Sequence, residues 1–196
     1  MVNWHLKYQV TVPEGKIGDW TVKRFIVSAK NEQLERLRAI MYRGRYTPAG
    51  TYTGLYHKGH IIMSDTPDEI RDHLGAVRVA KGQVLINGLG LGVVLKAILE
   101  KPEVEHVTVI EKAPEVIELV SKHYAHLHKS RLTVVQDDAF TFKPPKGIRY
   151  GAVWHDIWDD LCTDNLPEMT KLLRKYGKRC DWQGCWGKDW LKAWSR

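Results

Sequence analysis

The stretch QVLINGLGLGVVLKAILEK, residues 83–101, joins a short apolar run to three alternate glycines and then to a helical pattern. The apolar run predicts a buried strand, and the residues that follow Gly92 predict a helix. Glycines at such a turn let the backbone approach a nucleotide-like ligand closely. This stretch therefore predicts the first strand–helix unit of an α/β fold, with a ligand at its turn.

Apolar strands continue to alternate with helical patterns toward the C-terminus. We expect further strands over residues 106–112, 132–138, 150–157 and 179–184, and helices over residues 115–127, 165–177 and 187–194. Such alternation predicts a Rossmann-like, doubly wound parallel sheet with helices on both faces, truncated after its fifth strand. Ligands of these sheets bind beyond the carboxyl ends of the strands, so the residues just after each strand are the candidates for a site.

The residues before this pattern predict an N-terminal extension, rich in β-hairpins, over residues 1–75, followed by the Rossmann-like domain over residues 76–196. We expect strands over residues 4–12 and 20–27, followed by a helix capped by Ser28 or Asn31. A second hairpin is expected to turn at Lys58-Gly59. A further helix is expected to start at Asp65-Thr66-Pro67 with a capping side chain and to run to about Leu74. We expect this extension to cover the strand ends and to contact an acceptor, with Arg43, Arg45 and Tyr52 as candidates.

Composition narrows the class of protein. The 196 residues carry a formal net charge of +7, which favours an anionic partner but also fits solvated helix faces. The sequence shows no secretory signal and no membrane-spanning run, and its three cysteines cannot pair completely, so we expect a cytoplasmic protein with no membrane contact. Neither these cysteines nor the histidines near residue 126 have the spacing of a metal site, so no metal is expected.

The register of the glycines restricts the ligand. A triphosphate-binding loop would need Gly-Lys-Ser/Thr, and a dinucleotide fingerprint would need glycine where Val93 stands. Glu111 ends the second strand, 21 residues after Gly90, where a carboxylate can accept the hydroxyls of an adenosine ribose. A carboxylate in the pair Asp138-Ala139, after the third strand, can accept an adenine amino proton. Together these features predict S-adenosylmethionine (SAM) as the cofactor.

These motifs resemble the class I SAM-dependent methyltransferases, and within them the spermidine synthase branch most of all. The resemblance covers roughly residues 80–160 and rests on the glycine loop, on VEHVTVIEKAPEVIELVSKHY, on LTVVQDDAFTF and on YGAVWHDIWDD. It differs at Asn87, which adjoins the first glycine where methyltransferases place an acid nearby. The resemblance implies a set of cofactor-binding residues: Asn87, Gly88, Gly90, Gly92, Glu111, Lys112, Asp138 and Ala139.

The same resemblance implies where the chemistry takes place. Asp156, at the end of the fourth strand, stands where spermidine synthases carry the base that frees the attacking amine, and Asp159 stands where they hold a polyamine nitrogen. His155 and Trp158 are expected to contact the acceptor, with Trp158 either stacking on it or packing in the core. The glutamine and the tyrosine with which that branch holds its polyamine are missing from GHIIM and PDEIRDHL.

We therefore expect a SAM-dependent transferase, with a methyltransferase as the first interpretation. An aminopropyltransferase that uses decarboxylated SAM is the alternative enzyme, and a non-catalytic SAM-binding module is the alternative outside enzymes. The acceptor is left open between a small molecule and a nucleic acid, and a homodimer is also left open.

Overall fold

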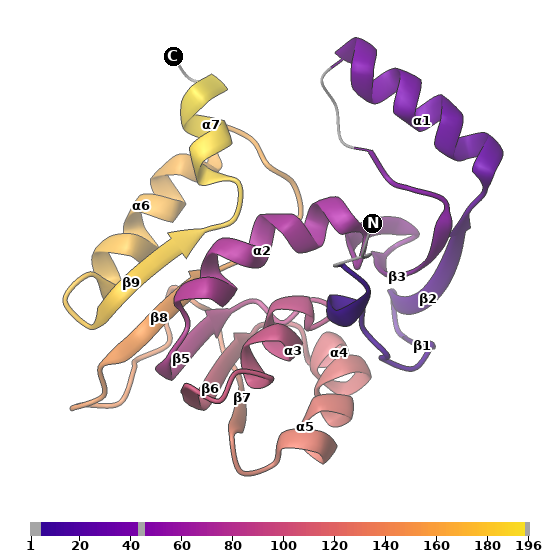
Figure 1. Ribbon diagram of the computed structural model, residues 1–196. Helices are drawn as coiled ribbons and strands as arrows, with labels where there is room; N and C mark the ends of the chain where they lie inside the picture. Colours follow the sequence, from indigo (N-terminus) through magenta and orange to yellow (C-terminus); the bar gives the residue numbers. More distant parts are fainter. Residues whose placement is uncertain (1–4, 43–45, 195–196) are drawn as a thin grey trace.

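The computed structural model describes residues 5–42 and 46–194, and these form two β-sheets with flanking helices (Figure 1). The larger sheet has five strands in the order β7-β6-β5-β8-β9, and every pair of neighbours is parallel. The strands are β5 (Gly82–Asn87), β6 (Val104–Glu111), β7 (Leu132–Gln136), β8 (Tyr150–His155) and β9 (Cys180–Cys185). This order confirms the predicted Rossmann-like, doubly wound sheet.

Helices cover both faces of the larger sheet. They are α2 (Pro67–Val79), α3 (Val93–Leu99), α4 (Pro114–Val116), α5 (Lys122–His128), α6 (Asn165–Tyr176) and α7 (Lys188–Trp194), with a π-helical turn over Ile117–Ser121 between α4 and α5. Successive residues of a strand point to opposite faces, so Val84 and Ile86 of β5 pack in one core with α2 and α3. Leu85 packs in a second core with α6 and α7.

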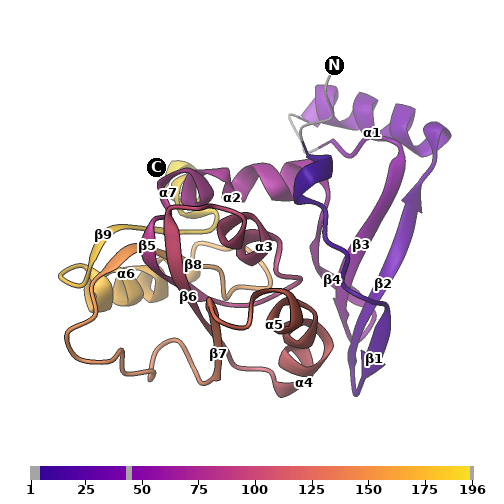
Figure 2. The same cartoon turned by 60° about the horizontal axis from the view of Figure 1, so that its bottom comes forward.

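The smaller sheet is antiparallel, in the order β1-β2-β3-β4, and belongs to the N-terminal portion. Its strands are β1 (Gly15–Ile17), β2 (Trp20–Val27), β3 (Gly50–His57) and β4 (His60–Ser64), and α1 (Ala29–Tyr42) follows β2. The hairpin turn at Lys58-Gly59 is confirmed, with both residues at positive φ. Ser28 caps α1 as predicted, because its Oγ accepts the N–H of Asn31 at 3.2 Å. Figure 2 shows this sheet beside the carboxyl ends of the larger sheet's strands.

Two expectations about the N-terminal portion are wrong. Residues 4–12 were expected to form the first strand, but a 3₁₀ turn (η1, Leu6–Tyr8) lies there and the first strand begins only at Gly15. The alternation of apolar and polar residues in this segment arises because Val10 and Val12 are buried in the core, although residues 5–12, the described part of the segment, pair with no strand. Helix α2 does begin at Pro67, but the expected capping side chain is wrong: the N-cap residue is Thr66, whose side chain makes no cap hydrogen bond, and the carboxylate of Asp65 accepts the N–H groups of Thr53 at 2.6 Å and Val10 at 3.0 Å.

Helix α2 is longer than expected and joins the two portions of the chain. It continues past Leu74 to Val79, because Ala76 and Val77 pack into the core of the larger sheet. The expected boundary between residues 75 and 76 therefore falls inside a continuous helix. No helix in the described ranges combines the length and the apolar character needed to cross a lipid bilayer.

Candidate functional site

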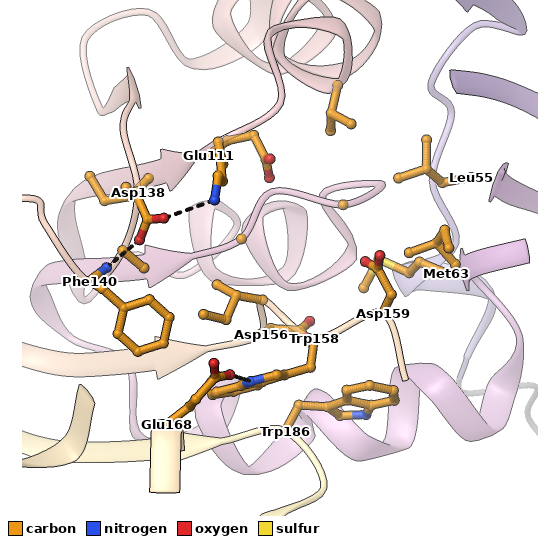
Figure 3. Close-up of a pocket in the computed structure, with 18 of the residues that line it drawn as sticks. Leu55, Met63, Glu111, Asp138, Phe140, Asp156, Trp158, Asp159, Glu168 and Trp186 are labelled. Atoms are coloured by element: carbon orange, nitrogen blue, oxygen red, sulfur yellow. Dashed lines mark hydrogen bonds and ion pairs between the residues drawn. The ribbon is translucent and has the colours of Figure 1, made fainter. Parts of the chain in front are cut away.

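A pocket of about 260 Å³ lies at the carboxyl ends of the parallel strands, between the two sheets. Figure 3 shows Glu111 and Asp138 along one of its sides, with Trp158 and Glu168 across from them. Leu55 and Met63 reach it from the antiparallel sheet. The expectation that the N-terminal portion covers the strand ends is therefore met by residues of β3 and β4, although their role toward an acceptor stays a prediction.

The glycine loop forms one wall of the pocket, at Gly88 and Gly90, which both have positive φ. A Cβ on Gly88 would overlap the carbonyl oxygen of Asp156, so the turn after β5 can pass that close to the turn after β8 only without a side chain. A Cβ on Gly90 would overlap the sulfur of Met63, which accepts the N–H of Leu91 at 3.3 Å. These contacts explain why the loop has glycine at both positions.

Glu111 holds the glycine loop in place. Its Oε2 accepts the N–H of Leu89 in the loop, and its Oε1 accepts the N–H of Ala113, both at 2.8 Å. The carboxylate lines the pocket, and each of its oxygens keeps a second lone pair that can accept a further hydrogen bond. The predicted contact with ribose hydroxyls is compatible with this arrangement.

Asp138 and Ala139 line the pocket in the turn after β7. Asp138 accepts the N–H of Phe140 at 2.8 Å and forms an ion pair with Lys112 at 3.0 Å (Figure 3). The hydrogen bond from Phe140 and the charge of Lys112 lower the pKa of Asp138, so it is ionised at neutral pH. Lys112 thus lies at the end of the pocket that was predicted to hold adenine.

Asp156 lies directly after β8, and its N–H donates to the carbonyl oxygen of Asn87 at 2.8 Å. Its Oδ2 is 3.8 Å from Nε2 of His73, a buried residue of α2. Burial raises the pKa of Asp156 to about 7, with smaller contributions from the negative charges of Glu69, Asp72 and Glu111. A carboxyl group with such a pKa can take up and release a proton near neutral pH.

Trp158 and Asp159 follow Asp156 and also line the pocket. Trp158 is 8% exposed and donates its Nε1–H to Glu168 at 2.9 Å, which holds the indole in the pocket wall. Trp158 belongs to the core that contains α6 and also borders the pocket, and its stacking on an acceptor stays a prediction. Asp159 is exposed, and partial burial of its carboxyl group raises its pKa.

Several predicted site residues do not reach the pocket. Asn87 and His155 are fully buried and hydrogen-bonded to each other, with 2.8 Å between Nδ2 and Nδ1. Burial lowers the pKa of His155 to about 4, so the imidazole is neutral and its Nδ1 accepts from the amide. Gly92 packs against the ring of Tyr124, and Tyr52 is buried and donates its hydroxyl to a backbone carbonyl. Arg43 and Arg45 lie outside the described residues.

Sequence reasoning missed the residues that other elements bring to the pocket. Trp186 follows β9 directly, so the rule that ligands bind beyond strand ends could have found it. The same rule could have found Phe140, four residues after β7. Seven further lining residues had no local signal, because they come from elements that only the tertiary fold places there: Trp20, Leu55, Ile62 and Met63 from the antiparallel sheet, Glu69 and His73 from α2, and Glu168 from α6.

The pocket is acidic although the chain as a whole is basic. Of the described residues that line it, seven are acidic and one is a lysine, Lys112. The acidic residues are Glu69, Glu111, Asp137, Asp138, Asp156, Asp159 and Glu168. Lys112 is already paired with Asp138, so the remaining carboxylates give the pocket a negative potential that attracts cations.

Comparisons with known proteins find similarity over part of the chain. No family model matches the chain. The chain is 29% identical over 112 residues to a polyamine aminopropyltransferase of Agathobacter rectalis, an alignment that covers 53% of this chain and 39% of that protein. The chain thus matches well under half the length of that relative.

Similar solved structures are mostly class I SAM-dependent methyltransferases. The spermidine synthase of Thermotoga maritima has a TM-score of 0.49 and 16% identity, covering 86% of this chain and 53% of that chain. The CcbJ methyltransferase of Streptomyces caelestis has a TM-score of 0.46 and 20% identity, covering 59% of this chain and 46% of that chain.

Proposed function

We propose that this protein transfers a carbon group from the sulfonium of an S-adenosyl cofactor to a cationic amine. The observation that carries the proposal is the position of Asp156. This carboxyl group, with a pKa near neutrality, lies in an acidic pocket beside the glycine loop. The partial sequence match to a polyamine aminopropyltransferase supports the same class of acceptor.

The pocket residues fit an adenosine-containing cofactor. Gly88 and Gly90 line the pocket with backbone alone, and Glu111 offers acceptor lone pairs beside them. Asp138 and Ala139 would border the adenine at the other end. When bound, such a cofactor supplies an electrophilic carbon attached to a positively charged sulfur.

Asp156 would act on the acceptor rather than on the cofactor. An aliphatic amine is protonated at neutral pH, and the carboxylates of the pocket attract the resulting ammonium ion. Asp156 takes one proton from it, which frees the nitrogen lone pair to form the new N–C bond as the C–S bond breaks. The electron pair of the broken bond stays on sulfur as a thioether, and Asp156 passes its proton to solvent.

The charge of the pocket favours aminopropyl transfer over methyl transfer. SAM carries a carboxylate that decarboxylated SAM lacks, and the only lysine among the described lining residues is paired with Asp138. Besides Asp138, six acidic side chains line the pocket. A cofactor that carries an ammonium group and no carboxylate is better matched to their negative charge than SAM is. Methyl transfer to an amine is the second candidate, because the glutamine and tyrosine that hold a polyamine in spermidine synthases are missing.

Calorimetry with SAM, decarboxylated SAM and NAD tests the cofactor. We expect decarboxylated SAM to bind at least about ten-fold more tightly than SAM, and NAD not to bind. Tighter binding of SAM would favour methyl transfer instead. Binding of NAD alone would contradict the proposal.

Mass spectrometry of products formed from a panel of linear diamines tests the transfer. We expect Asp156→Asn to lower kcat by roughly 10²–10⁴ while cofactor affinity stays within about three-fold. An Asp156→Asn variant that keeps its turnover but loses affinity for the cofactor would mean that Asp156 binds the cofactor and is not the base. Cofactor binding without transfer to any amine would favour the non-catalytic alternative.

A further inference from the structure

A basic face runs along α6 to the amino ends of β8 and β9, which lie at the end of the larger sheet opposite to the strand ends that border the pocket. Six exposed cations come from three places: Lys143 and Lys146 before β8, Lys171 and Arg174 on α6, and Lys178 and Arg179 in the turn before β9. The segments 139–151 and 169–180 that supply them contain no aspartate or glutamate. The strands are parallel, so the amino ends of β8 and β9 point away from the pocket at their carboxyl ends.

Backbone contacts hold these segments side by side. The N–H of Tyr150 donates to the carbonyl oxygen of Arg179 at 2.8 Å, and Arg149 donates to the carbonyl oxygen of Cys180 at 3.1 Å. Lys171 Nζ lies 5.2 Å from the ring centroid of Phe140, which lines the pocket, so Lys171 lies at the pocket end of the basic face and links it to the loop before β8. In Figures 1 and 2 the loop before β8 and the turn before β9 lie at the same end of the molecule, away from the antiparallel sheet.

The six cations of this basic face are not neutralised by the protein. Within the described part of the chain none of them forms an ion pair, and the nearest acid in sequence, Asp181, is paired with Arg149 at 2.8 Å. Lys171 and Arg174 follow one another at three-residue spacing, so their like charges repel along one side of α6. The dipole at the C-terminus of α6 favours cations in its last turn, but it does not explain Lys143 and Lys146 on a separate loop.

We propose that this basic face binds the phosphate backbone of double-stranded nucleic acid without reading its sequence. Residues 171–176 extend about 9 Å along α6, a length over which a duplex presents several phosphates. A single strand would need exposed aromatic rings for its bases to stack on. Phe142, Tyr150 and Tyr176, the other aromatic residues of the two segments, are buried. The inference does not depend on the proposed function, since binding needs neither cofactor nor turnover.

Fluorescence anisotropy with a labelled DNA duplex of about 20 base pairs tests this proposal over a salt series from about 50 to 200 mM. We expect log Kd to rise with log salt concentration with a slope of about 5, if all six cations contact phosphates. The triple variant K146A/K178A/R179A should bind at least about ten-fold more weakly, and its slope should fall by about 3. The matched control K16A/R24A/K30A removes the same charge from exposed positions in the N-terminal portion and should stay within about two-fold.

Four results would overturn the proposal. The first is no binding at the lowest salt concentration, and the second is an equal loss in both triple variants, which would mean attraction by net charge alone. The third is equally tight binding of a single strand. The fourth is displacement of the duplex by poly-L-glutamate as effectively as by unlabelled duplex of the same total charge, which would indicate an acidic protein partner. Thermal melting of all variants checks that each one is folded.

Discussion

Replacing Asp156 by asparagine should make the folded protein more stable at alkaline pH, although it removes the group on which the proposed transfer depends. The folded protein raises the pKa of this carboxyl group from 3.8 to about 7, mainly by burial. Between these two values the folded state binds the proton more tightly than the unfolded chain does. The free energy of unfolding of the wild type therefore falls as pH rises through this range, whereas the amide of the Asp156→Asn variant does not titrate.

The size of the effect follows from the two pKa values. A ten-fold difference in proton affinity corresponds to about 1.4 kcal/mol, so the full cost of ionising Asp156 in the folded protein is about 4 kcal/mol above pH 8. Part of this cost is already present at pH 5, because the unfolded chain is ionised there. The stability advantage of Asp156→Asn should accordingly grow by about 2–3 kcal/mol between pH 5 and pH 8.5.

Urea denaturation of wild type and variant at about pH 5 and pH 8.5 measures this change. Asp160→Asn is the matched control, because Asp160 is exposed nearby, and its effect should stay within about 0.5 kcal/mol at both pH values. A stability difference for Asp156→Asn that does not change with pH would refute the reasoning. It would mean that the carboxyl group is well solvated and is not the near-neutral base that the proposed transfer needs.

Three further variants test other parts of the molecule. Gly90→Ala should weaken binding of the S-adenosyl cofactor at least about ten-fold, as measured by calorimetry. The added Cβ would overlap the sulfur of Met63, and residue 90 has a positive φ that alanine rarely adopts. An unchanged Kd would remove the glycine loop from the site. Glu111→Ala should weaken the same binding by about 1–3 kcal/mol, since it removes both a ligand acceptor and the anchor of Leu89; equal affinity in a folded variant would contradict this. Asp65→Ala should lower the free energy of unfolding by about 3 kcal/mol in urea, because two buried N–H groups lose their acceptor; a change below about 1 kcal/mol would show that water replaces it.

Much of the larger sheet could be predicted from the sequence alone. Each strand of a covered parallel sheet is a short apolar run, and each crossover helix has its own apolar face, so periodicity locates both without knowledge of their partners. The rule that ligands bind beyond the strand ends then pointed to Glu111, Asp138 and Asp156, and all three line the pocket. The register of the glycines can be read directly from the sequence, although the contacts that require glycine, with Asp156 at Gly88 and with Met63 at Gly90, appear only in the folded chain.

Only the tertiary structure decided what completes the pocket and what stays out of it. Met63 and His73 reach it because the antiparallel sheet and α2 pack against the strand ends, and no local pattern encodes that packing. Asn87 adjoins the glycine loop in sequence, yet it points into the core and pairs with His155, since successive residues of a strand face opposite sides of the sheet. The near-neutral pKa of Asp156 has the same origin. Burial and the charges of residues distant in sequence set it, and both exist only in the folded chain.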